Sequence, residues 1–151
     1  MQKWNSITEI LDFAINNEQE AHDFYMGLSE KMDRPWMSEI FKKFAAEEMG
    51  HKKKLEGIKS GKKWGVSDKK ALDLKIGDYL VAPEPGPEMD YQQALILAMK
   101  KEKNAFKLYT DLASTCGDDK LEEIFLALAQ EEAKHKLRFE IEYDDYVMNE
   151  N

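Results

Sequence analysis

The sequence is poor in the residues that cross-link or interrupt a chain. Its 151 residues include one cysteine, four prolines and eight glycines. The single Cys116 excludes an internal disulfide and a cysteine-ligated zinc or iron site. We expect Cys116 to behave as a small apolar residue near the end of a helix. The scarcity of proline and glycine favours long helices over a strand-rich fold.

Long apolar runs and an excess of basic charge are also missing. No stretch approaches the roughly 18 to 20 apolar residues of a membrane-spanning helix, and the N-terminus lacks the apolar core of a signal peptide. The formal net charge is −8, whereas nucleic-acid binding needs clustered lysine and arginine. We therefore expect a cytoplasmic protein without a nucleic-acid or membrane partner.

What the sequence does contain is an internal repeat. Residues 7–56 align without gaps to residues 91–140 at a constant offset of 84, with 15 identities in 50 pairs. The repeated positions include two glutamates, a histidine and a tyrosine in each half: Glu18, Tyr25, Glu48 and His51, then Glu102, Tyr109, Glu132 and His135. The chain is therefore interpreted as a duplicated unit.

Each unit is predicted to be a helical hairpin, because its apolar residues recur at alternating steps of three and four. In the first unit, Ser6 begins a capping-box sequence, and the helix carries core-facing residues up to Met32. It stops before Pro35, since a proline disfavours the α region for the residue before it. Pro35 opens the second helix, which we expect to end near Gly61.

The second unit repeats this pattern. Asp90 is expected to cap the third helix and Gly117 to close it. The fourth helix should begin at Asp118 or Asp119 and run to about residue 148. Residues 62–89 break the helical pattern and hold three of the four prolines. We expect them to run the length of the bundle and make the second and third helices parallel.

The predicted fold is thus all-α, a four-helix bundle made of two duplicated hairpins over residues 6–61 and 90–148, joined by the crossover 62–89. A length of 151 residues suits a single domain, 1–151, with a sizeable core.

Six residues that can bind metal occupy positions in the apolar stripes of these helices, so they must point into the bundle. A buried carboxylate without a partner is costly. Counting the rise of about 1.5 Å per residue away from each hairpin turn places all six at the same depth. They are Glu18, Glu48, His51, Glu102, Glu132 and His135.

The charge of this set predicts two metal ions. Four carboxylates carry four negative charges, which two divalent cations neutralise. In each Glu-x-x-His motif both side chains lie on one helix face, so each histidine can bind one ion while carboxylates bridge. Oxygen and nitrogen ligands without thiolate favour iron or manganese over structural zinc.

Tyr25 and Tyr109 lie two helical turns beyond Glu18 and Glu102 on the same faces. A buried phenol needs a hydrogen-bond partner. We expect a metal-bound carboxylate from a neighbouring helix to be that partner.

Three other residues are expected to stay outside the site. His22 falls off the apolar stripe and should be exposed, and Glu47 and Glu131 should lie on the solvated flank. Gly50 lies inside the second predicted helix, where close approach of another backbone is one explanation for a glycine.

At these motifs the chain resembles the rubrerythrin-like branch of the ferritin-like superfamily, over residues 7 to about 145. The resemblance implies a di-iron centre in which the six residues above are the iron ligands, a long crossover and a homodimer. A rubredoxin domain is absent, since its iron site needs four cysteines and the chain has one. Electrons are therefore expected from a separate donor protein such as rubredoxin.

The resemblance also implies an oxidoreductase that reduces hydrogen peroxide or dioxygen. The alternatives are a ferroxidase that handles iron and a non-catalytic metal-binding redox sensor. Ala105 stands where rubrerythrins carry an additional glutamate that takes over an iron on oxidation. Iron is therefore expected to keep His51 and His135 in both redox states, with weaker peroxidase activity.

Overall fold

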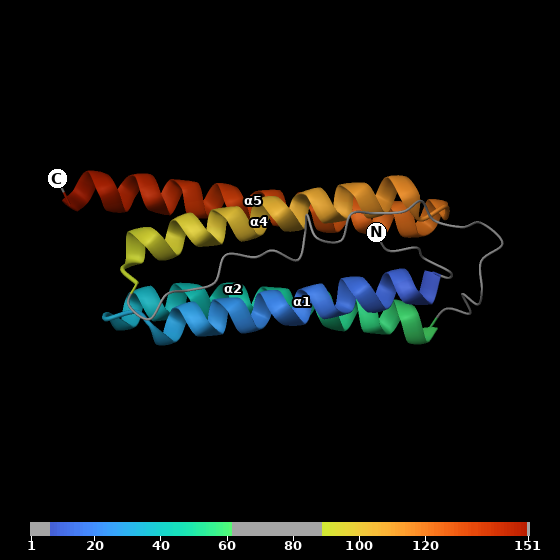
Figure 1. The fold of residues 1–151 in the computed structure, drawn as a ribbon, viewed down its shortest axis with the longest axis horizontal. Coiled ribbons are helices and arrows are strands. Elements are labelled where there is room, and N and C mark those ends of the chain that lie inside the picture. The colour runs from blue at the N-terminus through green and yellow to red at the C-terminus, as the bar shows by residue number, and fades with distance from the viewer. Residues whose placement is uncertain (1–6, 62–88, 151) are drawn as a thin grey trace.

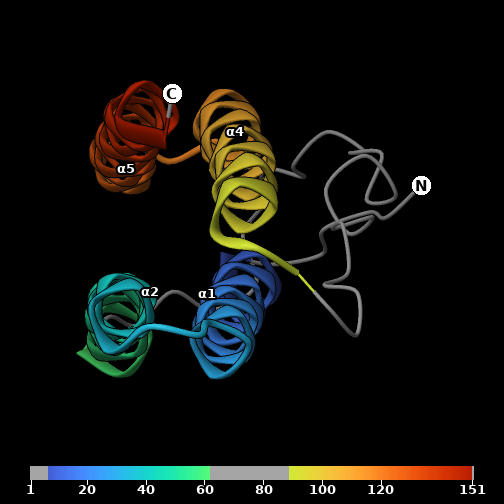
Figure 2. The same ribbon diagram turned by 90° about the vertical axis from the view of Figure 1, so that its left-hand side faces the viewer.

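The computed structural model describes residues 7–61 and 89–150, which form four long α-helices. They are α1 (Ile7–Glu30), α2 (Pro35–Gly61), α4 (Tyr91–Thr115) and α5 (Asp119–Glu150). α1 packs mainly against α2, and α4 against α5, as two hairpins (Figure 1). Seen end on, α1 lies beside α4 and α2 beside α5 (Figure 2). The predicted all-α four-helix bundle is confirmed.

The ends of α4 and α5 follow the local chemistry of the sequence. Asp90 caps α4: its carboxylate accepts from the Gln93 amide at 2.8 Å, and the Gln93 side chain accepts from the Asp90 amide at 3.1 Å. Gly117 follows α4 with φ 71°, a left-handed conformation that glycine adopts without steric cost. Asp118 then caps α5 by accepting from the Leu121 amide at 2.8 Å.

The first hairpin turns slightly earlier than predicted. α1 ends at Glu30, whereas the sequence suggested helix up to Met32. The backbone amides of residues 31 and 32 bond to the carbonyls of residues 28 and 29 at 3.1 and 3.4 Å, a tighter winding than in an α-helix. This leads the chain into α2, which begins at Pro35 as expected.

Two expectations fall on the chain outside the described residues. These are the cap at Ser6 and, apart from Met89, the crossover 62–89. The consequence expected of that crossover is confirmed, because α2 and α4 run in the same direction (Figure 1).

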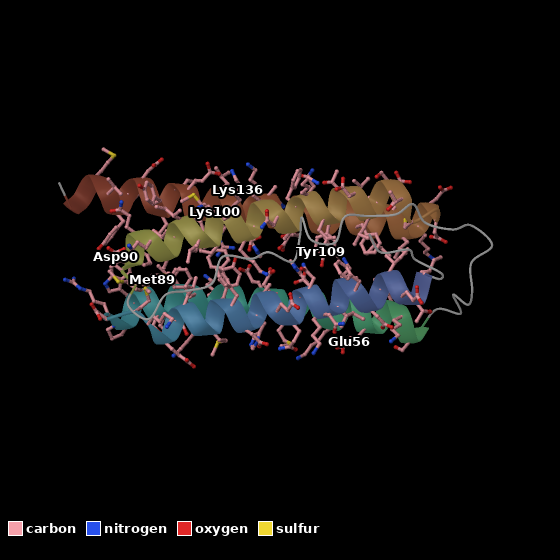
Figure 3. The ribbon with its side chains drawn as sticks, in the orientation of Figure 1. Glu56, Met89, Asp90, Lys100, Tyr109 and Lys136 are labelled. Carbon is pink, nitrogen blue, oxygen red and sulfur yellow. The ribbon has the colours of Figure 1, made fainter. Side chains whose placement is uncertain are left out.

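Two clusters of buried apolar residues fill the bundle on either side of its middle. One is built around Leu11, Leu112 and Phe125 and includes Cys116, which is buried as expected. The other is built around Phe41 and Phe139. Figure 3 shows Tyr109 pointing between the hairpins, whereas Glu56 lies on an outer face. No described helix is long and apolar enough to cross a membrane.

Candidate metal centre

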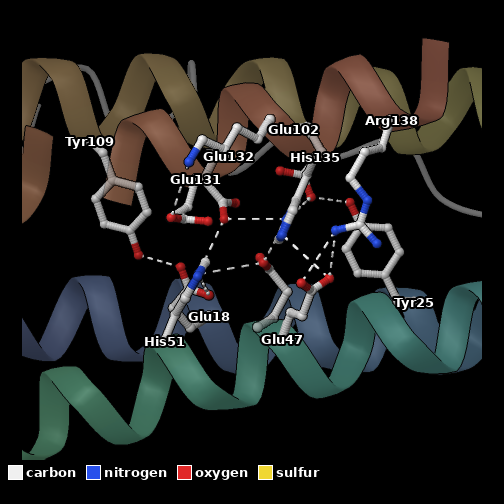
Figure 4. Close-up of polar contacts among 12 residues, drawn as sticks. Glu18, Tyr25, Glu47, His51, Glu102, Tyr109, Glu131, Glu132, His135 and Arg138 are labelled. Carbon is white, nitrogen blue, oxygen red and sulfur yellow. Dashed lines mark hydrogen bonds and ion pairs between the residues drawn. The ribbon is translucent and has the colours of Figure 1, made fainter. Parts of the chain in front are cut away.

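The six residues predicted to bind metal converge between the two apolar clusters. Figure 4 shows Glu18, His51, Glu132 and His135 pointing toward one another. α1 and α4 each supply one glutamate, and α2 and α5 each supply a glutamate and a histidine. The four carboxylates are at most 1% exposed, His135 is 2% exposed, and the His51 side chain is 15% exposed. The residues are Glu18, Glu48, His51, Glu102, Glu132 and His135.

The two histidines face the carboxylates through the same ring nitrogen. Nδ1 of His51 lies 3.5 Å from Glu18, 3.5 Å from Glu48 and 3.2 Å from Glu132. Nδ1 of His135 lies 3.3 Å from Glu48, 3.5 Å from Glu102 and 3.7 Å from Glu132. The imidazole rings are nearly parallel, at 6°, with centroids 5.8 Å apart.

These atoms form two groups that share two glutamates. One group is Glu18, Glu48, His51 and Glu132, and the other is Glu48, Glu102, Glu132 and His135. Within each group the possible ligand atoms all lie within 4.8 Å of one another. The arrangement therefore offers two adjacent sites with Glu48 and Glu132 between them.

The polar atoms in the cluster have unused bonding capacity. Seven side-chain atoms of these six residues are buried without a hydrogen-bond partner, including both Nδ1 atoms and both oxygens of Glu132. In the described part of the chain no other fully buried side-chain nitrogen or oxygen lacks a partner. Because such atoms are costly unless something binds them, the donor set fits metal ions.

Burial and repulsion from neighbouring carboxylates favour the protonated forms of Glu48 and Glu132 when no cation is bound. The pKa of Glu48 is raised well above its usual range by burial and then by the charges of Glu18 and Glu102. Burial, followed by repulsion from Glu102, Glu48 and Glu18, raises the pKa of Glu132. Burial lowers the pKa of His135, but Glu102 and Glu48 outweigh it and raise the pKa to about 10. Binding of a cation would displace these protons.

Each tyrosine binds a carboxylate from the opposite hairpin, as the sequence suggested. Tyr25 donates a hydrogen bond to Oε1 of Glu102, and Tyr109 donates one to Oε1 of Glu18. Both phenols are fully buried, and burial, together with the neighbouring carboxylates, raises their pKa values well above the usual range. They therefore stay protonated and fix one oxygen of each glutamate, while Oε2 of each has no partner.

Glu47 lies on the solvated flank as expected, with a side chain that is 38% exposed, but it also reaches back to the centre. Its Oε2 lies 3.5 Å from Nε2 of His135, the ring nitrogen that faces away from the cluster. Arg138 donates to both oxygens of Glu47 at 3.3 and 3.1 Å and lies over the ring of Phe44, 4.3 Å from its centroid. Phe44 meets His135 edge to face at 5.0 Å. Arg138 thus holds Glu47 against the histidine (Figure 4).

Sequence reasoning missed Arg138. The available indication was its position three residues after His135, nearly one helical turn along α5. The repeat equivalent of Glu47 behaves as expected: the Glu131 side chain is 49% exposed and pairs with Lys134 at 3.8 Å.

Two other expectations have outcomes. His22 lies outside both ligand groups, as predicted, but its side chain is only 27% exposed, and it pairs with Asp23 at 3.0 Å. Close approach of a backbone does not explain Gly50, since a Cβ there would have nothing within 4 Å. Ala105 is buried, and its methyl group offers no ligand atom.

Comparison with known proteins gives one family match and one solved structure with a similar fold. The sequence profile of the rubrerythrin family matches residues 9–143. A solved structure of a hypothetical protein from Pyrococcus furiosus aligns with a TM-score of 0.66 at 24% identity, over 92% of this chain and 89% of that one. This likeness bears on the fold alone. No curated protein matches the sequence.

Proposed function

Because the chain belongs to the rubrerythrin family, we propose that it is a di-iron oxidoreductase that reduces hydrogen peroxide or dioxygen to water. The supporting observation is the pair of ligand groups that share Glu48 and Glu132. Cleaving an O–O bond takes two electrons, and two adjacent ferrous ions, when bound there, would supply one each.

The proposal assigns a role to each ligand. Glu18 and His51 would hold one ion, Glu102 and His135 would hold the other, and Glu48 and Glu132, which lie in both groups, would contribute to both. Four carboxylates balance two divalent cations, so the buried centre becomes electrically neutral. The oxygen and nitrogen donors favour iron, with manganese or a mixed pair also compatible.

The surrounding residues hold this geometry and keep it dry. Tyr25 and Tyr109 act as outer partners that fix Glu102 and Glu18 through their hydroxyl groups. The apolar clusters on either side exclude water from the carboxylates. Since Ala105 cannot bind iron, His51 and His135 remain ligands in both redox states.

The electrons that reduce the irons again after each reaction must come from another molecule. The family resemblance supports a separate donor such as a rubredoxin and a homodimeric assembly. The absence of long apolar stretches agrees with the proposed cytoplasmic location.

The decisive experiment is anaerobic stopped-flow mixing of the diferrous protein with hydrogen peroxide. We expect both irons to be oxidised by one equivalent of peroxide, faster than Fe(II) in buffer. Oxidation no faster than in buffer would reject the proposal. Release of ferric iron after oxidation would favour a ferroxidase, and tight metal binding without reaction would favour a redox sensor.

A further inference from the structure

A continuous series of aromatic rings runs from the centre to the surface at one end of the bundle. Tyr25 stacks with Phe41 at a centroid distance of 6.5 Å, and Phe41 meets Tyr91 at 5.9 Å. Tyr91 meets Trp36 at 5.2 Å. Tyr25 is fully buried and bonded to Glu102, whereas Trp36 is 45% exposed. The series thus joins a residue of the centre to solvent.

The repeat shows that packing alone does not require this series. The offset of 84 places Tyr109 and Phe125 opposite Tyr25 and Phe41, and their rings stack at 5.9 Å. The equivalents of Tyr91 and Trp36, however, are Ile7 and Lys120. At these two positions the second arm therefore carries no aromatic ring, although the two hairpins have the same architecture.

Both tyrosines of the series also have a proton acceptor. Tyr25 donates to Glu102, and Tyr91 donates to Oε1 of Glu142 at 2.7 Å. A tyrosine that loses one electron also loses its phenolic proton, so a carboxylate held at the hydroxyl lets both leave together. Tryptophan, like tyrosine, can undergo one-electron oxidation, and the exposed Trp36 lies at the outer end of the series.

We propose that Tyr25, Tyr91 and Trp36 form a path for single electrons from the surface to the metal centre, used when the donor protein does not deliver them. The proposal rests on the peroxide-reducing function above. In this proposal, small soluble one-electron reductants, such as thiolates or ascorbate, donate electrons to Trp36 at this end of the bundle.

The transfers balance one electron at a time. Tyr25 gives an electron toward the peroxide being reduced, and its proton moves to Glu102. Tyr91 then restores Tyr25, which takes the proton back, while the Tyr91 proton moves to Glu142. Trp36 restores Tyr91, and the soluble reductant restores Trp36. When the irons are already ferric and cannot supply electrons, two such electrons, with two protons taken from solvent, convert one hydrogen peroxide to two waters.

The path can be tested without iron chemistry. Protein carrying Trp4→Phe and Trp64→Phe, loaded with redox-inert Zn²⁺, leaves Trp36 as the only tryptophan. A photo-oxidant in solution then oxidises Trp36 in a laser flash, and the same contacts carry an electron outward from the tyrosines. We expect the tryptophan radical to decay as tyrosyl absorbance grows.

Tyr91→Phe keeps the ring and removes the redox-active hydroxyl, so this coupled growth should be lost. Tyr143→Phe, which removes a tyrosine hydroxyl outside the series and away from the metal centre, should leave it unchanged. Trp36→Phe alters an exposed side chain and should abolish the tryptophan signal. Any tyrosyl absorbance that remains in this variant measures direct oxidation of tyrosines by the photo-oxidant. Coupled growth that persists in Tyr91→Phe would overturn the path.

A second measurement links the path to the centre and separates its failure from that of the proposed function. Protein whose irons are already ferric, mixed with peroxide without donor, should show a Trp36 radical by electron paramagnetic resonance that is missing in Tyr91→Phe. Diferrous protein that is oxidised by peroxide, but whose ferric form gives no Trp36 radical, would reject the path and leave the peroxide reduction standing. If iron does not react with peroxide, but the zinc protein still shows the coupled growth of tyrosyl radical, the proposed function is rejected and electron transfer along the aromatic series is retained.

Discussion

Tyr25 on α1 donates its hydrogen bond to Glu102 on α4, in the other half of the repeat. Tyr109 returns the same bond to Glu18. Each hairpin thus fixes a carboxylate that belongs to its partner, and neither hairpin alone has the hydrogen bonds that orient its own glutamate. The geometry of the centre is therefore a property of the assembled bundle.

Removing either hydroxyl should have nearly equal effects. Tyr25→Phe or Tyr109→Phe leaves a buried carboxylate oxygen without its donor, which costs about 1–3 kcal/mol. Urea denaturation of the metal-loaded variants measures this loss, with Tyr143→Phe at a half-buried, partly solvated position as control. Unchanged midpoints in both variants would show that these bonds contribute nothing to stability.

The shared and unshared ligands should differ in metal content. We expect about two iron ions per chain in the parent protein. Glu132→Gln should reduce the occupancy of both ions, because Glu132 contributes to both groups, whereas Glu18→Gln should affect one. Metal analysis after anaerobic loading measures this, with Glu131→Gln as the neighbouring control. Equal losses from Glu18→Gln and Glu132→Gln would contradict the shared role.

Glu47 should tune the ion bound by His135. A carboxylate at the outer nitrogen orients the imidazole, and losing such a partner typically weakens metal affinity about 10- to 100-fold. We expect Glu47→Gln to have this effect in competition titrations with a chelator. Glu131→Gln, at the equivalent position of the repeat, should have almost none. The same affinity in both variants would remove Glu47 from the centre.

Stability of the metal-free protein should fall as pH rises. The folded-state pKa values of Glu48, Glu132 and His135 lie above their ordinary values of 4.5, 4.5 and 6.5. The folded chain therefore binds more protons than the unfolded one above about pH 4.5, and this stabilisation disappears as each group deprotonates, near pH 10 for His135.

Thermal unfolding with chelator at about pH 5 and about pH 9 checks this linkage. The midpoint should be lower at the higher pH, and Glu48→Gln should reduce the difference. With metal bound the trend should reverse, because protons compete for the ligands. A metal-free midpoint that increases with pH would show that these groups do not dominate.

Gly50 offers a direct gain in stability. It lies in the interior of α2, is exposed, and a Cβ there meets nothing within 4 Å. Gly50→Ala should stabilise the protein by about 0.5–1 kcal/mol through helix propensity. Denaturation curves of Gly50→Ala and of Gly57→Ala, which is equally open, should shift alike. Destabilisation at Gly50 alone would reveal a role specific to that position.

The elements that sequence predicted well depend on local chemistry. Pro35, Asp90 and Gly117 set helix ends through their own backbone geometry and hydrogen bonds, so their effects needed no knowledge of the fold. The common depth of the six candidate ligands followed from helical rise and the 84-residue offset. Both kinds of information are contained in the spacing of residues along one hairpin.

The contacts that sequence missed cross between helices. Glu47 and Glu131 are equivalent in the repeat, yet only Glu47 lies against a histidine, because Arg138 draws it across from α2 to α5. Such a contact depends on helix rotation and on the reach of a long side chain, which periodicity does not encode. For the same reason the sequence did not specify which glutamates the two groups share.

The 84-residue offset has an evolutionary consequence. Each hairpin supplies two glutamates and one histidine, so two identical hairpins related by a twofold axis would assemble the whole ligand set. A gene for one hairpin could thus have encoded an ancestor that held the whole ligand set as a homodimer. Duplication and fusion of that gene would then have joined the two hairpins in one chain. Fusion released each copy from having to match the other. The two copies now differ at these functional positions. Arg138 corresponds to Lys54 in the other copy, and Trp36 corresponds to Lys120.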